Sequence, residues 1–403
     1  MVGTFRVFTV NSLVRFGHRF TGIPVAVCLL PADLCLDGEV LSNIASDMGA
    51  AVTAFVQPLF RPGQEVVLDG TSEYTRNDVF ALFWFTPLVE LSLCAHATLA
   101  AGHVILKELK SVHQAIEFKT LSDRISVVRD SWGQDTRIAL LLPADPQPCS
   151  LADYSDVKGG ASTSQRHARR ASTASTAVST TPTLDKKVTE AEAVAGLTRN
   201  RTIKAARAAF ESRWRGTGKS DRVASALSNH PSHGTGGLQS MAPEHFENLE
   251  GLTETILGSM LNPPLVRAVV YGPLHRNLLI HITGGPTELR HFAPVFTPEI
   301  LVLGTQNKVS SLVVTCSPPA GANYDFAARC FSPWTNVEEE AMTGGSYSVL
   351  AAYWSARCGL KELRGLLGNH RKGLVNLMVS RSRGEYVQMS GSSQTIITGN
   401  YDL

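Results

Sequence analysis

The chain has 403 residues, of which 43% are hydrophobic and 18% charged, and its formal net charge is +2. This composition is typical of a globular protein that is long enough for two domains with cores of their own. A net charge this close to zero argues against a dedicated nucleic-acid binder, because phosphate contacts need a concentrated basic surface. The partner that we expect is a small molecule.

Targeting signals and cysteine content set further limits. Residues 1–20 alternate apolar and polar side chains, and no signal peptide is visible there. No apolar run approaches the roughly 20 residues that span a bilayer, so no membrane helix is expected. The 7 cysteines are scattered and never in C-x-x-C spacing, which favours reduced thiols in a cytoplasmic protein and no zinc knuckle.

Residues 1–149 are expected to form one domain. Runs of β-branched and aromatic residues predict its strands, and helical periodicity predicts its helices. The expected strands are 4–10, 24–30, 54–56, 79–85, 125–128 and 137–142, and the expected helices are 41–48 and about 97–109.

Residues 150–240 differ in kind from the rest of the chain. Between 159 and 183 lies a Ser/Thr/Ala tract with no aromatic and no acidic residue. Such a composition cannot bury enough apolar surface to offset the entropy lost on ordering. We predict a mostly disordered insertion, with an Ala-rich segment at 190–214 that favours a helix. The run Arg169-Arg170-Ala171-Ser172 resembles a kinase site, but low complexity explains it better.

Residues 241–403 are expected to form a second domain. Helices are predicted at 246–260 and 346–357, with a shorter helix ending at Leu367, and strands at 266–271, 278–282, 300–302, 312–316, 374–380 and 386–389. Both halves place strands before and after a central helix. The sequence therefore predicts an α+β fold of two pseudo-symmetric domains related by internal duplication, whose terminal strands can cross between them.

Two segments, one in each half, look like copies of the same device. Phe85-Thr86-Pro87 and Phe331-Ser332-Pro333 each end a strand, and a polar turn and a helix start follow each. Proline cannot lie in a central ladder, and Thr, Ser and Gly leave backbone N–H groups free at a helix N-terminus. Two such helix starts facing each other would make a cradle for a small anion.

The first helix start carries His96. The positive potential of a helix N-terminus favours the neutral imidazole, which can accept or donate a proton. We interpret the neighbouring Cys94 as a core thiol. His96 and His103 lie seven residues apart on one helical face, but without further ligands at coordinating spacing this pair indicates packing and no metal site.

The second helix start carries Glu340, Thr343, Gly344 and Gly345. Glu340 can act as an acid or a base, although a solvated run of acidic residues explains residues 338–340 equally well. The other three offer backbone N–H groups to a carboxylate, and the alternative is a plain helix cap.

Four motifs in order resemble the phenazine biosynthesis PhzF-like family. Residues 22–27 resemble its "GNPxAV", residues 44–56 its "iAxExNlSETaFv", and residues 85–99 its "FTPxxELxLCGHATL". Residues 325–345 resemble "DFxxRxFxPxxGxxEDPxTGS", and Tyr353-Trp354 stand where the family has "YW". The resemblance covers nearly the whole chain apart from the insertion.

The resemblance implies a diaminopimelate-epimerase-like fold. In it, two similar domains each wrap a barrel-like sheet around a central helix, and the active site lies between them. The characterised members move a proton without any cofactor and usually form homodimers. Family glutamate, histidine and aspartate side chains handle the proton and the substrate, and helix N-termini hold the carboxylate.

The chain departs from the family at several of these positions. The family's glutamate falls on Val52, which cannot take a proton, and its aspartate falls on Glu340. Ala95 replaces a glycine, and Gly345 replaces the final serine with Ser346 beside it. His96 is retained. The expected catalytic residues are therefore His96 and Glu340, and the expected substrate-binding residues are Ala95, Thr343, Gly344, Gly345 and Ser346.

Three functions remain open from the sequence. The first is a cofactor-independent isomerase or tautomerase that acts by proton transfer on a small carboxylated or polyketide-derived metabolite of secondary metabolism. The second is a decayed relative that serves as a binding or scaffold protein, since Val52 removes a catalytic group. The third is a cyclase that works by shape and hydrogen bonding alone, for which valine is no handicap.

Overall fold

A computed structural model describes residues 3–15, 17–18, 20–60, 71–121, 124–130, 137–143, 149–153, 243–335, 337–340, 344–369, 371–379 and 386–403. The expectations for the insertion between 154 and 242, including the helix at 190–214 and the site at Ser172, lie outside these residues. So does the side chain of Glu340 and the whole of Thr343.

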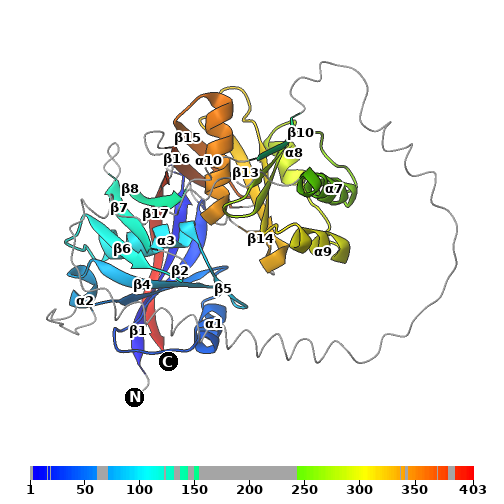
Figure 1. Cartoon of the computed structure of the whole chain (residues 1–403). Helices are drawn as coiled ribbons and strands as arrows, with labels where there is room; N and C mark the ends of the chain where they lie inside the picture. The colour runs from blue at the N-terminus through cyan, green and yellow to red at the C-terminus, as the bar shows by residue number, and fades with distance from the viewer. Residues whose placement is uncertain are drawn as a thin grey trace, which may run out of the picture. The chain divides into compact units, whose positions relative to one another are not determined.

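The first lobe is a ring of strands around one helix (Figure 1). The strands follow one another around the ring in the order β1 (Thr4–Val14), β2 (Ile23–Leu29), β3 (Thr53–Pro58), β4 (Val79–Phe85), β6 (Ala115–Lys119), β7 (Arg124–Asp130), β8 (Arg137–Pro143) and β17 (Tyr386–Asp402), which returns to β1. Helix α3 (Ala95–His103) fills the ring and continues as a π-helical turn, Val104–Glu108. Every residue of α3 is buried, because its side chains are small or apolar and strands surround it.

The second lobe repeats this plan around α10 (Gly344–Cys358). Its strands are β9 (Cys149–Asp153), β10 (Val266–Gly272), β11 (Asn277–Ile282), β12 (Ser311–Cys316), β13 (Phe326–Ser332), β15 (Glu362–Leu367) and β16 (Gly373–Val379), followed by β17. Helices α7 (Pro243–Gly258), α8 (Pro286–His291) and α9 (Pro298–Gln306) pack outside these strands. In the first lobe, α1 (Gly38–Asp47) and the short α2 (Ser72–Thr75) lie outside the ring.

The strand pairings show the internal duplication. In the first lobe the pairs β1–β2, β2–β3, β3–β4, β4–β6 and β6–β7 are antiparallel, parallel, antiparallel, parallel and antiparallel. The five pairs from β10 to β16 repeat this series. A short strand follows each predicted device, β5 (Glu90–Leu91) after Pro87 and β14 (Val337–Glu340) after Pro333. The predicted duplicated α+β fold is therefore confirmed.

Three element predictions in the second half are wrong. Residues 362–367 form strand β15 and not a helix, because they pair with β13 and β16. Residues 300–302 lie inside helix α9, whose Thr297 side chain accepts a hydrogen bond from Ile300 N and caps the helix. Strand β17 does not end at residue 389 but continues to Asp402, where it pairs with β1.

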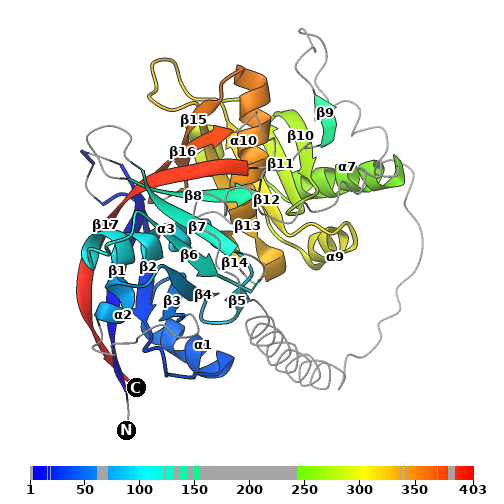
Figure 2. The same ribbon diagram turned by 60° about the vertical axis from the view of Figure 1, so that its left-hand side comes forward.

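Strand β17 links the two lobes (Figure 2). Its first residues pair with β16 and β8, and its last ones pair with β1. Strand β9 pairs with β10 and ends at Asp153. The largest cluster of buried apolar side chains includes residues of both α3 and α10, while smaller clusters lie under α7–α9 and under α1.

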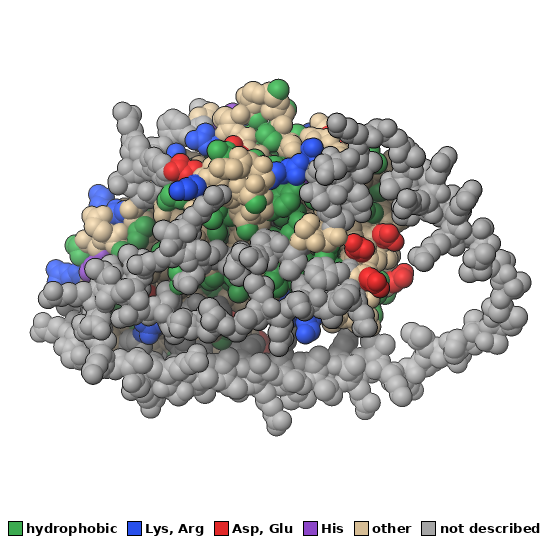
Figure 3. All heavy atoms as spheres, turned by 45° about the horizontal axis from the view of Figure 1, so that its top comes forward, with side chains coloured by type: hydrophobic (Ala, Val, Ile, Leu, Met, Phe, Trp, Pro, Cys, Tyr) green, Lys and Arg blue, Asp and Glu red, His purple; other side chains and the backbone are tan. Residues whose placement is uncertain are grey.

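Helix composition and surface charge complete the description of the fold. Among the described residues, no helix is long and apolar enough to cross a bilayer. On the face seen in Figure 3, Lys and Arg side chains lie in separate spots among apolar and acidic ones.

A buried polar network fixes the end of α3 to β17. His103 Nε2 lies 3.1 Å from Glu108 Oε1 and 3.2 Å from Thr395 Oγ1, and the Thr395 hydroxyl donates to Glu108 at 2.8 Å. The other ring nitrogen, Nδ1, is buried without a partner among the described residues. Protonation would bury an unpaired N–H group, so the network holds the neutral ring.

We expect this network to make folding stability depend on pH. Burial lowers the pKa of His103 to about 4 from its ordinary 6.5, although Glu108 opposes the shift. Between pH 4 and pH 6.5, His103 therefore binds a proton in the unfolded chain but not in the folded chain. The free energy of unfolding should fall by about 1–3 kcal/mol as the pH decreases from 6.5 to 4. Urea titrations across this range measure the slope. A His103→Gln variant should lose this component, and an unchanged slope in that variant would contradict the assignment.

Candidate functional site

The N-terminus of α3 places His96 in the first turn of a buried helix. Cys94 is the N-cap in an extended conformation, and its carbonyl accepts bonds from the Thr98 N–H at 3.0 Å and from the Thr98 hydroxyl at 2.8 Å. Cys94 Sγ lies 3.6 Å from His96 Nδ1 and 3.7 Å from Nε2. His96 is 4% exposed. Cys94 is buried as expected, and it also contacts the candidate histidine.

The N-terminus of α10 lies against the segment that leads into α3. Gly344 is its first residue, and a Cβ placed there would lie 2.4 Å from Leu93 Cγ. A Cβ on Gly345 would lie 2.4 Å from His275 Cβ. Both glycines are therefore needed for close approach. The two helix starts meet, as the cradle hypothesis requires.

Residues Ser346 and Tyr347 follow the two glycines in the first turns of α10, and both are buried. Ser346 Oγ lies 3.3 Å from Cys330 Sγ of β13. Burial raises the pKa of Tyr347 well above its ordinary value, and the neighbouring Cys94 and Cys330 raise it further. Tyr347, Cys94 and Cys330 all belong to the same cluster of buried side chains. Its hydroxyl is fully buried and has no hydrogen-bond partner among the described residues.

The unpartnered hydroxyl of Tyr347 leads to a prediction about folding stability. Tyr347→Phe removes an unpaired buried hydroxyl, so the free energy of unfolding should stay unchanged or rise by about 1 kcal/mol. Tyr74→Phe is the matched control, because the buried Tyr74 hydroxyl donates to the Leu30 carbonyl at 2.5 Å, and we expect it to lose about 1–2 kcal/mol. Chemical denaturation measures both. A larger loss in the Tyr347 variant than in the control would show that this hydroxyl has a structural partner.

Two further polar side chains approach the cradle, and the sequence did not single them out. Asn277 begins β11 and is 1% exposed; its Oδ1 accepts a hydrogen bond from the Ser311 hydroxyl. Its Nδ2 has no partner among the described residues and lies 3.1 Å from the Cβ position built on Gly345. Burial lowers the pKa of His275, and a hydrogen bond with the Pro143 backbone opposes this. The Nε2 atom of His275 is also buried without a partner in the described chain.

These donors have a common requirement. The amide N–H groups of Asn277 lie next to the first turn of α10, where backbone N–H groups have no partner within the helix. Donors cannot satisfy one another, so an acceptor is needed between them. An oxyanion such as a carboxylate satisfies both kinds of donor and is favoured by the helix dipole.

The remaining predicted positions have mixed outcomes. Ala95 is fully buried at the start of α3, and Val52 is 8% exposed within the apolar cluster of the first lobe, just before β3. Glu340 pairs in register with Cys330 through the backbone of β14. Together with the Cys330–Ser346 contact, this register places the backbone of Glu340 one strand away from the start of α10.

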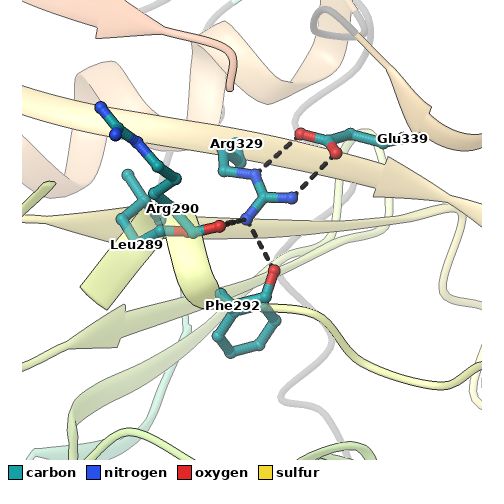
Figure 4. A network of polar contacts seen from close by, with 5 residues as sticks. All are labelled: Leu289, Arg290, Phe292, Arg329 and Glu339. Carbon is teal, nitrogen blue, oxygen red and sulfur yellow. Dashed lines mark hydrogen bonds and ion pairs between the residues drawn. The ribbon is translucent and has the colours of Figure 1, made fainter. Parts of the chain in front are cut away.

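The neighbouring Glu339 forms an ion pair, although its side chain is 32% exposed. Its two carboxylate oxygens accept hydrogen bonds from Arg329 Nε at 2.7 Å and Nη2 at 2.8 Å. The third nitrogen, Nη1, donates to the carbonyls of Leu289 at 2.7 Å, Arg290 at 3.1 Å and Phe292 at 2.6 Å (Figure 4). Arg329 is 4% exposed, and its guanidinium also lies 4.8 Å from the Phe331 ring centre. This ion pair holds β14 directly before Glu340.

Comparisons with known proteins agree with this architecture. A family model described as phenazine biosynthesis-like protein, PhzC–PhzF, matches residues 17–221 and 287–399. A human phenazine biosynthesis-like domain-containing protein is 24% identical over 388 residues, covering 95% of this chain and 94% of that protein. A Pseudomonas aeruginosa protein described as an uncharacterized isomerase is 36% identical over 135 residues, covering 33% of this chain and 43% of its own. The crystal structure of a PhzF family protein from Enterococcus faecalis gives a TM-score of 0.57 at 18% identity and full coverage of both chains, which shows the shared fold.

Proposed function

The chain belongs to the phenazine biosynthesis-like PhzC–PhzF family, and from this premise we propose that it is a cofactor-independent isomerase that transfers a proton on a small carboxylated metabolite. Family membership, together with the partial match to a bacterial isomerase, supports an isomerase-type activity. The metabolite's class and its place in secondary metabolism are part of the proposal. So are the small-molecule partner and the homodimer that the resemblance implies.

The observation that carries the proposal is the meeting of two helix N-termini, one of which carries His96. Gly344 of α10 lies against Leu93, and Cys94 touches His96 at the start of α3. The α10 side supplies unpartnered donors for an anion, and the α3 side supplies a group that can exchange a proton. A carboxylate held at α10 would present its neighbouring carbon to His96.

The proposed reaction needs two proton-handling groups or one that acts twice. His96 is the first, and Glu340 is the second candidate because its backbone lies beside Cys330. Val52 cannot take either role. An epimerisation with two opposed bases would need a second base, and Val52 cannot supply it. A tautomerisation, or an isomerisation that removes and returns the proton on one side, does not need a base at this position.

Deuterium uptake tests the proposal even while the substrate is unidentified. The full chain is incubated in D2O with a panel of small enolisable carboxylic acids, and mass spectrometry follows each compound. We expect one compound to gain a carbon-bound deuterium with native protein and not with heat-denatured protein. If no compound gains deuterium while some bind with saturation, the isomerase proposal is overturned.

The alternative is a binding protein that kept the fold, and the burial of Val52 in an apolar cluster favours it. The same panel distinguishes the two functions. A binding protein would bind a compound saturably, and this binding would depend on Asn277. The compound would gain no deuterium, and its mass would be the same after incubation with the His96→Ala variant.

A further inference from the structure

A concave pocket lies on the face of β13 that is turned away from α10. On this strand Ala328 and Cys330 belong to the core around α10, whereas Ala327 belongs to the core under α8. The pocket opens on the α8 side, between that helix, β13 and the loop before β16. Its lining includes Pro286, Leu289, Arg290, Arg329, Asn369 and Lys372.

The lining of the pocket carries three cationic side chains, those of Arg290, Arg329 and Lys372. Arg329 lies at its floor, where Glu339 neutralises it, but Arg290 and Lys372 have no ion-pair partner among the described residues. Figure 4 shows the Arg290 side chain extending away from the Arg329 network. Partial burial lowers the pKa of Lys372, and the nearby charges of Arg290 and Arg15 lower it further.

Acidic residues on the adjoining elements are already engaged. Glu288 of α8 is exposed, and its carboxylate accepts a hydrogen bond from Gly285 N at 2.7 Å. Asp325, just before β13, accepts one from Arg364 N at 2.6 Å. Among the described residues that line the pocket, none is a carboxylate.

Backbone contacts hold the cationic segments together. Gly22 N donates to the Lys372 carbonyl at 3.0 Å, and Arg371 Nε donates to the Gly22 carbonyl at 3.2 Å, so the segment after Arg15 is attached to this loop. Gly368 N donates to the Ala328 carbonyl at 3.0 Å, and its φ of +84° suits glycine. The fold thus brings the positive charges of Lys372, Arg290 and Arg15 near one another. A bound anion would offset the repulsion between them.

We propose that this pocket is a second binding site, which takes the oxyanion of a small phosphorylated or carboxylated metabolite. The Arg290 guanidinium can bind two oxygens as a fork, and Lys372 supplies a compact second charge. The pocket has a volume of only about 10 Å³, so the oxyanion would lie at its mouth, and the rest of the molecule would lie outside. The site is independent of the proposed isomerase activity, because it lies across β13 from α10.

Titration calorimetry at low and constant ionic strength tests the site on the full chain, with inorganic phosphate and benzoate as separate probes. We expect saturable binding of at least one probe that weakens at least tenfold in the double variant Arg290→Gln, Lys372→Gln. The control Arg267→Gln, Lys361→Gln removes the same charge elsewhere and should bind as the native chain does. Preference for phosphate or for benzoate identifies which source of oxyanion the site takes.

Two results would overturn this proposal. One is the absence of saturable binding of either probe to the native chain, and the other is equal affinity in the double variant and the native chain. Circular dichroism checks that both variants fold. If the double variant does not fold, the conservative pair Arg290→Lys, Lys372→Arg replaces it. This pair keeps both charges and changes the fork geometry, so it should weaken binding measurably, and unchanged affinity there would count against the site.

Discussion

Replacing Arg329 by methionine is expected to lower the free energy of unfolding by about 2–4 kcal/mol, because buried backbone carbonyls lose their hydrogen-bond donor. The methionine would fill much of the space of the arginine stem. It would leave the Glu339 carboxylate and three backbone carbonyls without their donor. The carbonyls lie around the end of α8 and cannot turn to water without moving that helix. Urea denaturation of the variant and the native chain measures the difference.

Two neighbouring variants control for this effect. Arg290 takes part in the network only through its backbone carbonyl. Arg290→Met should therefore change the free energy of unfolding by less than about 0.5 kcal/mol. Glu339→Gln keeps an acceptor for Arg329 and the three carbonyl bonds, and it should cost less than Arg329→Met. Equal losses for Arg329→Met and Arg290→Met would show that the guanidinium network does not stabilise the fold.

The duplicated device could be predicted from the sequence because its causes are local. Proline ends a strand in both Phe85-Thr86-Pro87 and Phe331-Ser332-Pro333. The small residues that follow favour a helix start through local interactions alone. The resulting helices, α3 and the first half of α10, are buried as a central helix requires. The same local signals place His96 and Gly344 at helix starts, independently of the rest of the fold.

Strands β15 and β17 could not be predicted in this way because distant partners decide them. Leu363, Leu366 and Leu367 have a spacing that fits a helix as well as a strand, and pairing with β13 selects the strand. Residues 390–400 of β17 are rich in Ser, Thr and Gly, and 396–400 are exposed, so this sequence resembles a loop. Eleven residues of β1 offer a free edge, and the backbone hydrogen bonds of that edge make it a strand.

The polar residues around the site were missed for a similar reason. His275 lies in a turn, and Asn277 begins the strand that follows it. The local sequence His-Arg-Asn matches no motif. Only the approach of Gly345 gives them a role, and the sequence separates these positions by about 70 residues. Conversely, Glu339 and Glu340 looked alike as a charge run. The structure assigns Glu339 to Arg329, which the sequence alone could not show.

The largest expected effect on activity concerns His96. If the deuterium panel yields a substrate, His96→Ala should lower turnover by about a hundredfold or more, which is the usual contribution of general acid–base catalysis. The side chain is 4% exposed and touches Cys94, so the truncation also leaves a small cavity. His96→Gln fills that cavity without restoring a proton-transfer group. A loss in turnover shared by both variants, with KM little changed, therefore reports chemistry and not packing.

Glu340→Gln is the companion variant and distinguishes a two-group mechanism from a one-group mechanism. If Glu340 exchanges the second proton, this variant should lose turnover to a similar extent, and the double variant should lose little more, because residues that act as a unit are not additive. Glu339→Gln is the matched control, since that carboxylate is bound to Arg329. Val52→Glu should not simply restore the family's reaction, because Glu340 and Gly345 have also changed the cradle. Full turnover in both the His96 and Glu340 variants, with no deuterium in the product, would contradict acid–base catalysis and leave a cyclase that works by shape.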